Sequence, residues 1–325
     1  MEDKTLLSVK NLEVKYFLRN STVEAVNDIS FHIDRGERVG LVGETGAGKT
    51  TTALSIMGLI PNPPGKITKG SILLDGEDLL KKSVKSMRKI RGENISMIFQ
   101  DPMTSLNPVI TVGDQIMEVI QLHEKLSKAE ATKRAQEMLE LVGIPGDRYN
   151  EYPHQFSGGM KQRVLIAIAL ACNPKLLIAD EPTSALDVTI QAQILELIGE
   201  LKDKLEMSLL LITHDLGVVA ETCDRVFVMY AGSIVESGTI QAVYKHMMHP
   251  YTIGLFNSLP RLDVDTDRLE PIKGMMPDPT NLPKGCAFCD RCPYTTEHCK
   301  QERPDLRELE DGHAAACFRM FDKEA

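Results

Sequence analysis

A glycine-rich segment near the N-terminus has the composition and spacing of a phosphate-binding loop. The segment Gly43-Glu-Thr-Gly-Ala-Gly48-Lys49-Thr50 fits G-x-x-x-x-G-K-[ST], and it lies between a predicted strand, Val39–Val42, and a predicted helix, Thr51–Met57. In such a loop, backbone N–H groups and the positive end of the helix dipole face the phosphates. Lys49 would contact the β- and γ-phosphates, and the Thr50 hydroxyl would bind Mg²⁺. The pattern therefore predicts an ATP site formed by Gly43, Glu44, Thr45, Gly46, Ala47, Gly48, Lys49, Thr50 and Thr51.

Two carboxylates end an apolar segment further along the chain. Leu176-Leu-Ile-Ala-Asp180-Glu181 predicts a buried strand that ends in charge, at the edge of a parallel sheet where ligands bind. Asp180 would hold Mg²⁺, and Glu181 would orient or deprotonate the water that attacks the γ-phosphate. A solvated acidic turn is the alternative for such a pair in isolation. The phosphate-binding loop in the same chain favours the catalytic interpretation.

Beyond these two motifs, the chain resembles the ATP-binding-cassette (ABC) family. The segment Phe156-Ser157-Gly158-Gly159-Met160-Lys161-Gln162-Arg163 is similar to the family's signature motif. Further matches stand in the family's order at Gln100, at Ser184-Ala-Leu-Asp187 and at His214. Tyr16 matches the aromatic residue that stacks on adenine, although the adjacent Phe17 competes for that assignment. The resemblance runs from about Leu7 to the end of the chain.

The resemblance implies that two cassettes bind ATP between them. The signature residues of one cassette would then meet the γ-phosphate held by the other. It implies catalytic roles for Glu181, His214 and Gln100, and Mg²⁺ ligation by Thr50, Gln100 and Asp180. The residues that contact nucleotide outside the loop would be Tyr16, Gln100, Ser157, Gly158, Gly159, Asp180 and Asp187. Hydrolysis would let the two cassettes separate and so drive a membrane partner.

Several segments resemble the ATP-binding subunits of bacterial dipeptide and oligopeptide importers. They are Gln100–Pro108, Ala185–Ile194, His214–Glu221 and His249–Thr252. This resemblance implies a heterodimer with a second ABC ATPase subunit, two transmembrane permease subunits and an extracytoplasmic solute-binding protein, with the chain at the cytoplasmic face of the cell membrane. Importers of nickel or another small solute share much of the pattern and are the alternative. A soluble ABC ATPase outside transport is less favoured, because such proteins usually carry two cassettes, long coiled coils or basic arms.

The strands and helices predicted around these motifs indicate an α/β protein with a largely parallel sheet. Apolar runs predict strands at Arg38–Val42, Ser71–Leu74, Ile95–Phe99, Leu176–Ala179, Leu209–Ile212, Val226–Met229 and Ser233–Val235. Helical spacing and a capping box predict a helix at Ser127–Val142, and another helix follows Asp187. The resemblance implies a RecA-like core with an antiparallel β subdomain and a helical subdomain. We expect the nucleotide-binding domain over residues 1–258, with a helical insert at about 86–165, and a small extension over 259–325.

Composition limits the partners of the chain. Its 325 residues are 42% hydrophobic and 26% charged, with a formal net charge of −9. This acidic balance argues against nucleic acid, which requires a basic face. The longest apolar stretch, Val164–Cys172, is too short to span a membrane, and the acidic start Met1-Glu-Asp-Lys does not read as a signal peptide. We therefore expect any membrane role to come through a partner.

Five of the seven cysteines crowd near the C-terminus, as Cys286-x-x-Cys289-x-x-Cys292-Pro293, Cys299 and Cys317. This spacing favours a soft metal centre, either an iron–sulfur cluster or zinc as the alternative. Some members of the peptide-importer family are thought to hold a [4Fe–4S] cluster on cysteines that match Cys286, Cys292, Cys299 and Cys317. Cys289 departs from that pattern, so the ligand set is either those four or one that includes Cys289. Cys172 and Cys223 are expected to be small core residues.

Overall fold

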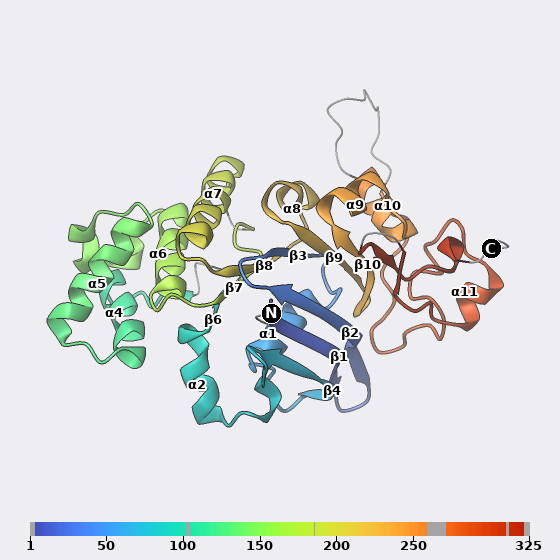
Figure 1. Cartoon of the computed structure of the whole chain (residues 1–325), viewed down its shortest axis with the longest axis horizontal. Coiled ribbons are helices and arrows are strands. Elements are labelled where there is room, and N and C mark those ends of the chain that lie inside the picture. Colours follow the sequence, from blue (N-terminus) through green and yellow to red (C-terminus); the bar gives the residue numbers. More distant parts are fainter. Residues whose placement is uncertain (1–3, 102–104, 185, 259–270, 310–311, 322–325) are drawn as a thin grey trace. The chain divides into compact units, whose positions relative to one another are not determined.

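The computed structural model describes residues 4–101, 105–184, 186–258, 271–309 and 312–321 (Figure 1). The chain divides into two units. The first unit comprises Asp78–Ile212, Ile33–Arg38 and the residues before Leu7, and the second comprises Leu7–His32, Val39–Glu77 and the chain from Thr213 onward. Ala185 and residues 102–104, within two of the segments matched above, and residues 259–270, the start of the expected extension, lie outside the described residues.

Three parallel strands form the sheet of the first unit, in the order β8-β7-β6. They are β6 (Ile95–Ile98), β7 (Leu176–Asp180) and β8 (Ser208–Thr213). Every residue of these strands is buried, as the continuous apolar runs predict for a parallel sheet covered on both faces. In this register Asp180, the last residue of β7, lies opposite Ile212 of β8.

Helices make up the rest of the first unit. They are α2 (Val84–Glu93), α4 (Val112–His123), α5 (Lys128–Leu141), α6 (Gly158–Leu170) and α7 (Val188–Lys204), with short 3₁₀ turns η1 (Leu79–Lys81), η2 (Gly146–Asn150) and η3 (Pro153–Gln155). The predicted capping box is confirmed, since Ser127 and Glu130 satisfy each other's backbone N–H at the start of α5. Figure 1 shows α4 and α5 side by side next to α6. Within this group the phenol of Tyr149 in η2 donates a 2.7 Å hydrogen bond to Asp114 of α4.

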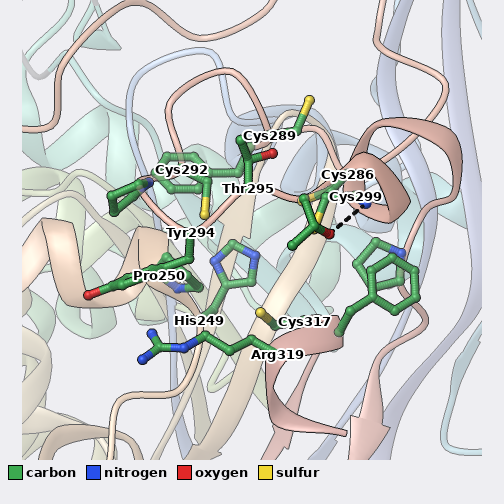
Figure 2. Close-up of a pocket in the computed structure, with 15 residues that line it drawn as sticks. His249, Pro250, Cys286, Cys289, Cys292, Tyr294, Thr295, Cys299, Cys317 and Arg319 are labelled. Carbon is green, nitrogen blue, oxygen red and sulfur yellow. Dashed lines mark hydrogen bonds between the residues drawn. The ribbon is translucent and has the colours of Figure 1, made fainter. Parts of the chain in front are cut away.

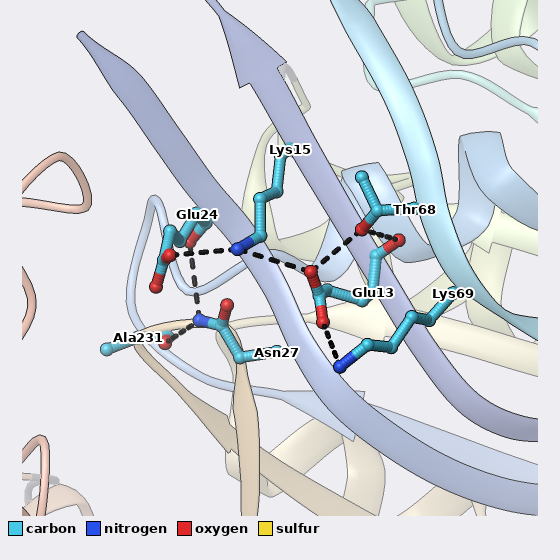
Figure 3. Close-up of polar contacts among 7 residues, drawn as sticks. All are labelled: Glu13, Lys15, Glu24, Asn27, Thr68, Lys69 and Ala231. Atoms are coloured by element: carbon cyan, nitrogen blue, oxygen red, sulfur yellow. Dashed lines mark hydrogen bonds and ion pairs between the residues drawn. The ribbon is translucent and has the colours of Figure 1, made fainter.

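An antiparallel sheet forms one part of the second unit, in the order β2-β1-β4-β5. Its strands are β1 (Thr5–Phe17), β2 (Thr22–Asp34), β4 (Gly65–Leu74) and β5 (Glu77–Asp78). On its surface the Lys15 ammonium lies 3.2 Å from the carboxylate of Glu13 and 3.0 Å from that of Glu24, and Lys69 pairs with the other oxygen of Glu13 (Figure 3). Burial raises the pKa of Glu13, but hydrogen bonds from Thr68, Lys15 and Lys69 outweigh burial and leave it below the usual range.

The other sheet of the second unit has β9 (Arg225–Tyr230) between β3 (Arg38–Val42) and β10 (Ser233–Thr239). β3 pairs with β9 in parallel, whereas β10 runs antiparallel to β9. Two-residue strands, β12 (Ala314–Ala315) and β11 (Arg307–Glu308), continue the sheet beyond β10. The helices of this unit are α1 (Lys49–Ile56), α8 (Leu216–Thr222), α9 (Ile240–Lys245), α10 (Pro250–Asn257) and α11 (Glu297–Gln301), with a 3₁₀ turn η4 (Phe318–Met320).

The predicted strands all occur, and their bounds shift by a few residues. β4 is the largest difference, because it begins six residues before Ser71. The expectation of a largely parallel sheet holds for the pairs among β6, β7 and β8 and for β3 with β9, but β1 with β4, β9 with β10, β10 with β12 and β11 with β12 pair antiparallel. Within the described residues, no helix combines the length and the apolar character needed to cross a bilayer.

Candidate functional site

The phosphate-binding loop connects β3 to α1 and passes so close to its neighbours that two positions require glycine. A Cβ atom on Gly43 would lie 2.1 Å from the carbonyl oxygen of Met229, and one on Gly48 would lie 2.5 Å from that of Ala25. Gly48 also has a φ of +106°, in the left-handed region that side chains avoid. The loop is therefore a rigid backbone turn supported by β9 and β2.

Lys49 is the first residue of α1 and is 5% exposed. Its ammonium donates to the carbonyl oxygens of Gly43 at 2.6 Å and of Glu44 at 3.1 Å. The cation therefore lies against the same loop that would bind a phosphate. No side chain among the described residues caps α1. The first-turn N–H groups of a helix that lacks a side-chain cap suit phosphate oxygens.

Asn27 of β2 supports the loop from one side. Its side-chain amide donates to the carbonyl of Ala231 at 3.1 Å (Figure 3), and its backbone N–H donates to the carbonyl of Gly232 at 2.7 Å. The N–H of Gly232 in turn donates to the carbonyl of Ala47 in the loop at 2.8 Å. The β9–β10 turn is therefore joined by hydrogen bonds to both β2 and the loop.

Glu44 ties the other side of the loop to residues far along the chain. Its backbone N–H donates to the phenol oxygen of Tyr251 at 2.9 Å, and its carboxylate receives two hydrogen bonds from Arg291. Neither partner carries a signal in the sequence for this contact. Tyr251 lies in a segment matched only by resemblance, and Arg291 lies between Cys289 and Cys292, in a pattern typical of metal binding.

In the first unit, the acidic pair and Gln100 lie together at the carboxyl edge of the sheet. Asp180 ends β7 and is 2% exposed. Glu181 follows with a φ of +46°, and its N–H donates to the carbonyl of Ile212 at 2.8 Å. The side-chain amide of Gln100 donates to the Glu181 carboxylate at 3.1 Å. Residues other than glycine rarely adopt a left-handed φ, so the backbone at Glu181 is strained. Such strained residues are common at functional sites.

The signature residues lie at the start of α6. Ser157 is its N-cap, and the Ser157 hydroxyl accepts from the N–H of Met160 at 3.4 Å. Gly159 lies so near α7 that a Cβ atom would be 2.6 Å from the side chain of Ile190. Asp187 caps α7 by accepting from the N–H of Ile190 at 3.1 Å. The structure thus places Ser157, Gly158, Gly159 and Asp187 at two adjoining helix N-termini.

The remaining predicted residues belong to the second unit. His214 follows β8 and is exposed, and the next residue, Asp215, caps α8 by accepting from two backbone N–H groups at 2.8 and 3.2 Å. Tyr16 is half-buried and pairs with Gly65 on β4, whereas Phe17 is 50% exposed. The loop, Tyr16 and His214 thus belong to the second unit, whereas Gln100, Asp180, Glu181, Ser157 and Asp187 belong to the first.

All five C-terminal cysteines line one cavity of about 290 Å³, which also includes His249, Phe288, Tyr294 and Arg319. Figure 2 shows the sulfur atoms of Cys292 and Cys317 turned toward the His249 ring, whereas the sulfur of Cys289 points away. The Cys289 thiol instead lies 3.5 Å from the carboxylate of Asp290. Among the described residues, no three His, Cys, Asp or Glu side chains converge closely enough to hold a metal ion.

Burial governs the chemistry of this cavity. It raises the pKa of the Cys286 thiol to about 12 and also raises the pKa values of the Cys289, Cys292 and Cys317 thiols. These thiols are therefore protonated at neutral pH unless a cation replaces the protons. Burial lowers the pKa of His249 to about 3, and its Nδ1 accepts from the N–H of Tyr251 at 3.1 Å, so the ring is neutral with its proton on Nε2.

Comparison with known proteins agrees with this geometry. Residues 26–184 match the ABC transporter family, and residues 235–299 match the oligopeptide/dipeptide transporter C-terminal region. The chain is 52% identical over 322 residues to the oligopeptide transport ATP-binding protein AppD of Bacillus subtilis, covering 98% of both chains. It is 50% identical to the oligopeptide transport ATP-binding protein OppD of Escherichia coli, covering 98% of this chain and 94% of OppD.

Solved structures support the same fold. The ATP-binding cassette MJ0796, in a dimeric post-hydrolysis state bound to ADP and Pi, matches with a TM-score of 0.65 and 28% identity, covering 72% of this chain and 99% of that one. The cbiO1 protein of Clostridium perfringens, part of the ABC transporter complex cbiONQ, matches with a TM-score of 0.65 and 31% identity, covering 75% and 92%. The chain has the ABC ATPase fold, and it belongs to the family of oligopeptide and dipeptide transport ATP-binding proteins.

Proposed function

We propose that this chain hydrolyses ATP to drive a membrane importer of oligopeptides or dipeptides. One observation carries the ATPase assignment: the loop from Gly43 to Thr51 leaves no room for side chains at Gly43 and Gly48 and places the Lys49 ammonium over its carbonyl oxygens. Such a loop holds phosphate through backbone N–H groups and one cation. The peptide cargo follows from the family, whose members AppD and OppD are named for oligopeptide transport.

Each residue of the site has its own role in ATP hydrolysis. Lys49 stabilises the charge that develops as the γ-phosphoryl group leaves, and the start of α1 adds its dipole. The hydroxyl of Thr50, the buried carboxylate of Asp180 and the amide of Gln100 are oxygen donors, which suit Mg²⁺. When bound, Mg²⁺ would neutralise phosphate charge. Glu181 orients and deprotonates the attacking water, and Gln100 holds the Glu181 carboxylate by its hydrogen bond.

The other site residues serve nucleotide recognition and assembly. Tyr16 would stack on adenine, and His214 would donate to the γ-phosphate. Ser157, Gly158 and Gly159 start α6, whose 13 residues give it a strong N-terminal dipole for the phosphate of a companion cassette. Asp187, which caps α7, would lie at the same boundary between the cassettes.

The assembly that we propose has three kinds of partner chain. The chain pairs with a second ABC ATPase as a heterodimer and binds two transmembrane permeases at the cytoplasmic face of the cell membrane. An extracytoplasmic solute-binding protein delivers the peptide. Within the chain, residues 1–258 form the nucleotide-binding domain with its helical insert at about 86–165, and residues 259–325 form an extension.

ATP turnover by the reconstituted complex tests this assignment. The complex in vesicles should hydrolyse MgATP faster when the loaded solute-binding protein is added, and Lys49→Ala should lower turnover about a hundredfold or more. Labelled dipeptides and oligopeptides should enter the vesicles, and nickel should not. ATP turnover that persists at full rate in Lys49→Ala would refute the site, and uptake of nickel in place of peptide would refute the cargo.

We also propose that Cys286, Cys292, Cys299 and Cys317 hold a [4Fe–4S] cluster, with zinc as the alternative. The chemistry of the donors fits, because soft thiols line one cavity and a bound cation would replace the protons that burial keeps on Cys286, Cys292 and Cys317. The described side chains do not converge closely enough to hold an ion as they stand, so binding would require them to move together. The Cys289 sulfur points away from the His249 ring, which supports a ligand set that does not include Cys289. A cluster would supply a structural clamp for this part of the chain.

Metal analysis of the protein purified without oxygen tests the cysteine proposal. Wild type should contain about four irons per chain and show the broad absorption of a cluster. Cys292→Ser should lose the iron, and Cys289→Ser should keep it. One equivalent of zinc without iron would support the alternative, and absence of both metals would refute a metal site.

A further inference from the structure

We propose that Arg291 compensates the charge of Glu44 and so positions the phosphate-binding loop to accept a triphosphate. Arg291 lies between Cys289 and Cys292, 247 residues from Glu44 along the chain. The proposal rests on the ATPase function above and extends it, because it assigns part of the nucleotide site to the C-terminal part of the chain.

The contact between the two side chains is a bidentate ion pair. One guanidinium nitrogen of Arg291 donates to the Glu44 carboxylate at 2.8 Å, and the other donates to its second oxygen at 3.0 Å. The Arg291 side chain is only 6% exposed, whereas that of Glu44 is 30% exposed. Planar, parallel hydrogen bonds of this kind are among the stronger polar contacts in proteins, and their partial burial limits screening by water.

Arg291 is held in place independently of Glu44. Its Nε donates to the carbonyl of Lys273 at 3.1 Å, and one terminal nitrogen lies 3.3 Å from the phenol oxygen of Tyr230. Its guanidinium carbon also lies 5.7 Å from the ring centre of Tyr230 and 5.8 Å from that of Phe288, within reach of cation–π attraction. The cation therefore has a fixed position, and it should keep that position when Glu44 is changed.

The backbone of Glu44 is held from the same direction. The phenol oxygen of the fully buried Tyr251 accepts its N–H at 2.9 Å. The ring of Tyr251 packs on Tyr230, with centres 4.5 Å apart, and on Phe288, with centres 5.5 Å apart. Both the main chain and the side chain of Glu44 are thus bonded to one packed cluster.

Glu44 lies where its negative charge affects the binding of a phosphate. It directly follows Gly43, whose carbonyl oxygen accepts from Lys49, so its carboxylate is part of a loop that must receive a polyanion. An uncompensated carboxylate there would repel the phosphates and weaken binding roughly five- to tenfold, the order that one Coulomb repulsion gives at intermediate dielectric. A guanidinium remains charged at all relevant pH values, so the compensation is permanent.

Nucleotide affinity of the full-length chain, measured at equilibrium with fluorescent MgATP, MgADP and adenosine analogues, tests the proposal. Arg291→Ala should weaken MgATP binding about five- to tenfold, MgADP less, and adenosine hardly at all, because the repulsion scales with phosphate charge. Glu44→Gln should bind MgATP at least as tightly as wild type. The double variant should return close to wild type, and the loss in Arg291→Ala should shrink in high salt.

A purely structural ion pair gives a different pattern. In that case Glu44→Gln and Arg291→Ala would lose affinity alike for all three ligands, and this result would overturn the proposal. In the assembled complex, Arg291→Ala should raise the KM for ATP by the same factor and leave kcat within about twofold. A fall in kcat with unchanged KM would also refute it.

Controls separate this proposal from the ATPase assignment and from misfolding. Arg307→Ala removes an exposed arginine that lies over Phe321 in the same part of the chain, and it should leave MgATP affinity unchanged. If Arg291→Ala does not fold, Arg291→Gln, which removes the charge but keeps much of the side chain, takes its place: it should weaken MgATP binding about five- to tenfold, and unchanged affinity would refute the proposal. Failure of wild type to bind MgATP would refute the ATPase assignment, whereas equal binding by wild type and Arg291→Ala would refute only the role of Arg291.

Discussion

Replacing Glu236 with Gln would test a fully buried polar contact of the second unit. The Glu236 side chain is fully buried on β10, and its Oε1 accepts from the N–H of Met248 at 2.8 Å and from Nε2 of His313 at 2.8 Å. Its Oε2 accepts from the N–H of His249 at 2.9 Å. The carboxylate therefore joins β10 both to the start of α10 and to the residue before β12.

Glutamine matches the shape of Glu236 but not its hydrogen bonding. In its better orientation, the amide oxygen keeps the two contacts of Oε1, and the NH₂ group then faces the N–H of His249. One backbone donor and one amide donor are left buried without an acceptor, at about 1–3 kcal/mol each, and the charge assistance of the two retained bonds is lost. We expect the free energy of unfolding of this unit to fall by about 2–6 kcal/mol.

Hydrogen exchange of the purified chain measures this loss locally. The backbone N–H groups of Met248 and His249 should exchange faster in Glu236→Gln by a factor that corresponds to the fall in stability, and urea unfolding should show the same shift. Glu302→Gln is the matched control, since Glu302 is an exposed partner of His298 and should change stability by less than about 0.5 kcal/mol. If exchange and unfolding of Glu236→Gln stay within that same range, the reasoning about its three acceptor contacts is wrong.

Three further predictions address the site and the helical part of the first unit. Glu181→Gln should bind MgATP normally but release phosphate about 10²–10⁴ times more slowly, and normal turnover would contradict its role as the base. Gly48→Ala should weaken MgATP binding more than tenfold because its Cβ meets a backbone carbonyl, whereas Gly36→Ala, with a φ of +71° but no atom within 4 Å, should bind normally. Burial raises the pKa of Tyr149 to about 12, so wild type should lose stability as pH rises from about 10, where the unfolded tyrosine ionises, toward 12. Tyr149→Phe should lack this part of the slope and cost about 1 kcal/mol at neutral pH, through the lost bond to Asp114, and identical urea midpoints at every pH would contradict this.

Local sequence patterns predicted much of the fold. They succeed where the residues that form a motif are the same residues that form the loop or helix end. The loop at Gly43–Thr50 was predicted together with its strand and helix, and the structure has β3 and α1 at those positions. The capping box at Ser127 predicted the start of α5 to the residue. Asp187, selected by resemblance as a nucleotide contact, caps α7 in the structure, a role that its position before an apolar helix allows.

The long strands β1 and β2 were not predicted individually, and their irregularities explain why. The pairing of β1 with β4 shifts register between Lys10 and Glu13, and Asn11 has a φ of +49°. In β2, Asp28 has a φ of +56°, and it accepts from the side-chain amide of Asn11 at 3.0 Å. Each irregularity changes the face on which apolar residues fall, so the two-residue alternation that marks a strand is interrupted.

The contacts of Glu44 could not be predicted from local pattern. Tyr251 and Arg291 meet it only because the chain from Thr213 onward packs beside the loop within one unit. Sequence motifs identify which residues can contact a ligand, but they do not predict which distant side chains hold those residues in place. Such supporting residues become visible only through tertiary packing.

The two-residue strands β12 and β11 continue the sheet past β10, where Glu236 and Ser237 pair with Ala315 and Ala314. An uncovered strand offers its backbone donors and acceptors to any extended chain that approaches, including another copy of itself. The C-terminal segment thus occupies part of the edge that β10 would otherwise present. A chain truncated before Arg307 would present β10 as an open edge and should aggregate at concentrations where the full chain stays dispersed.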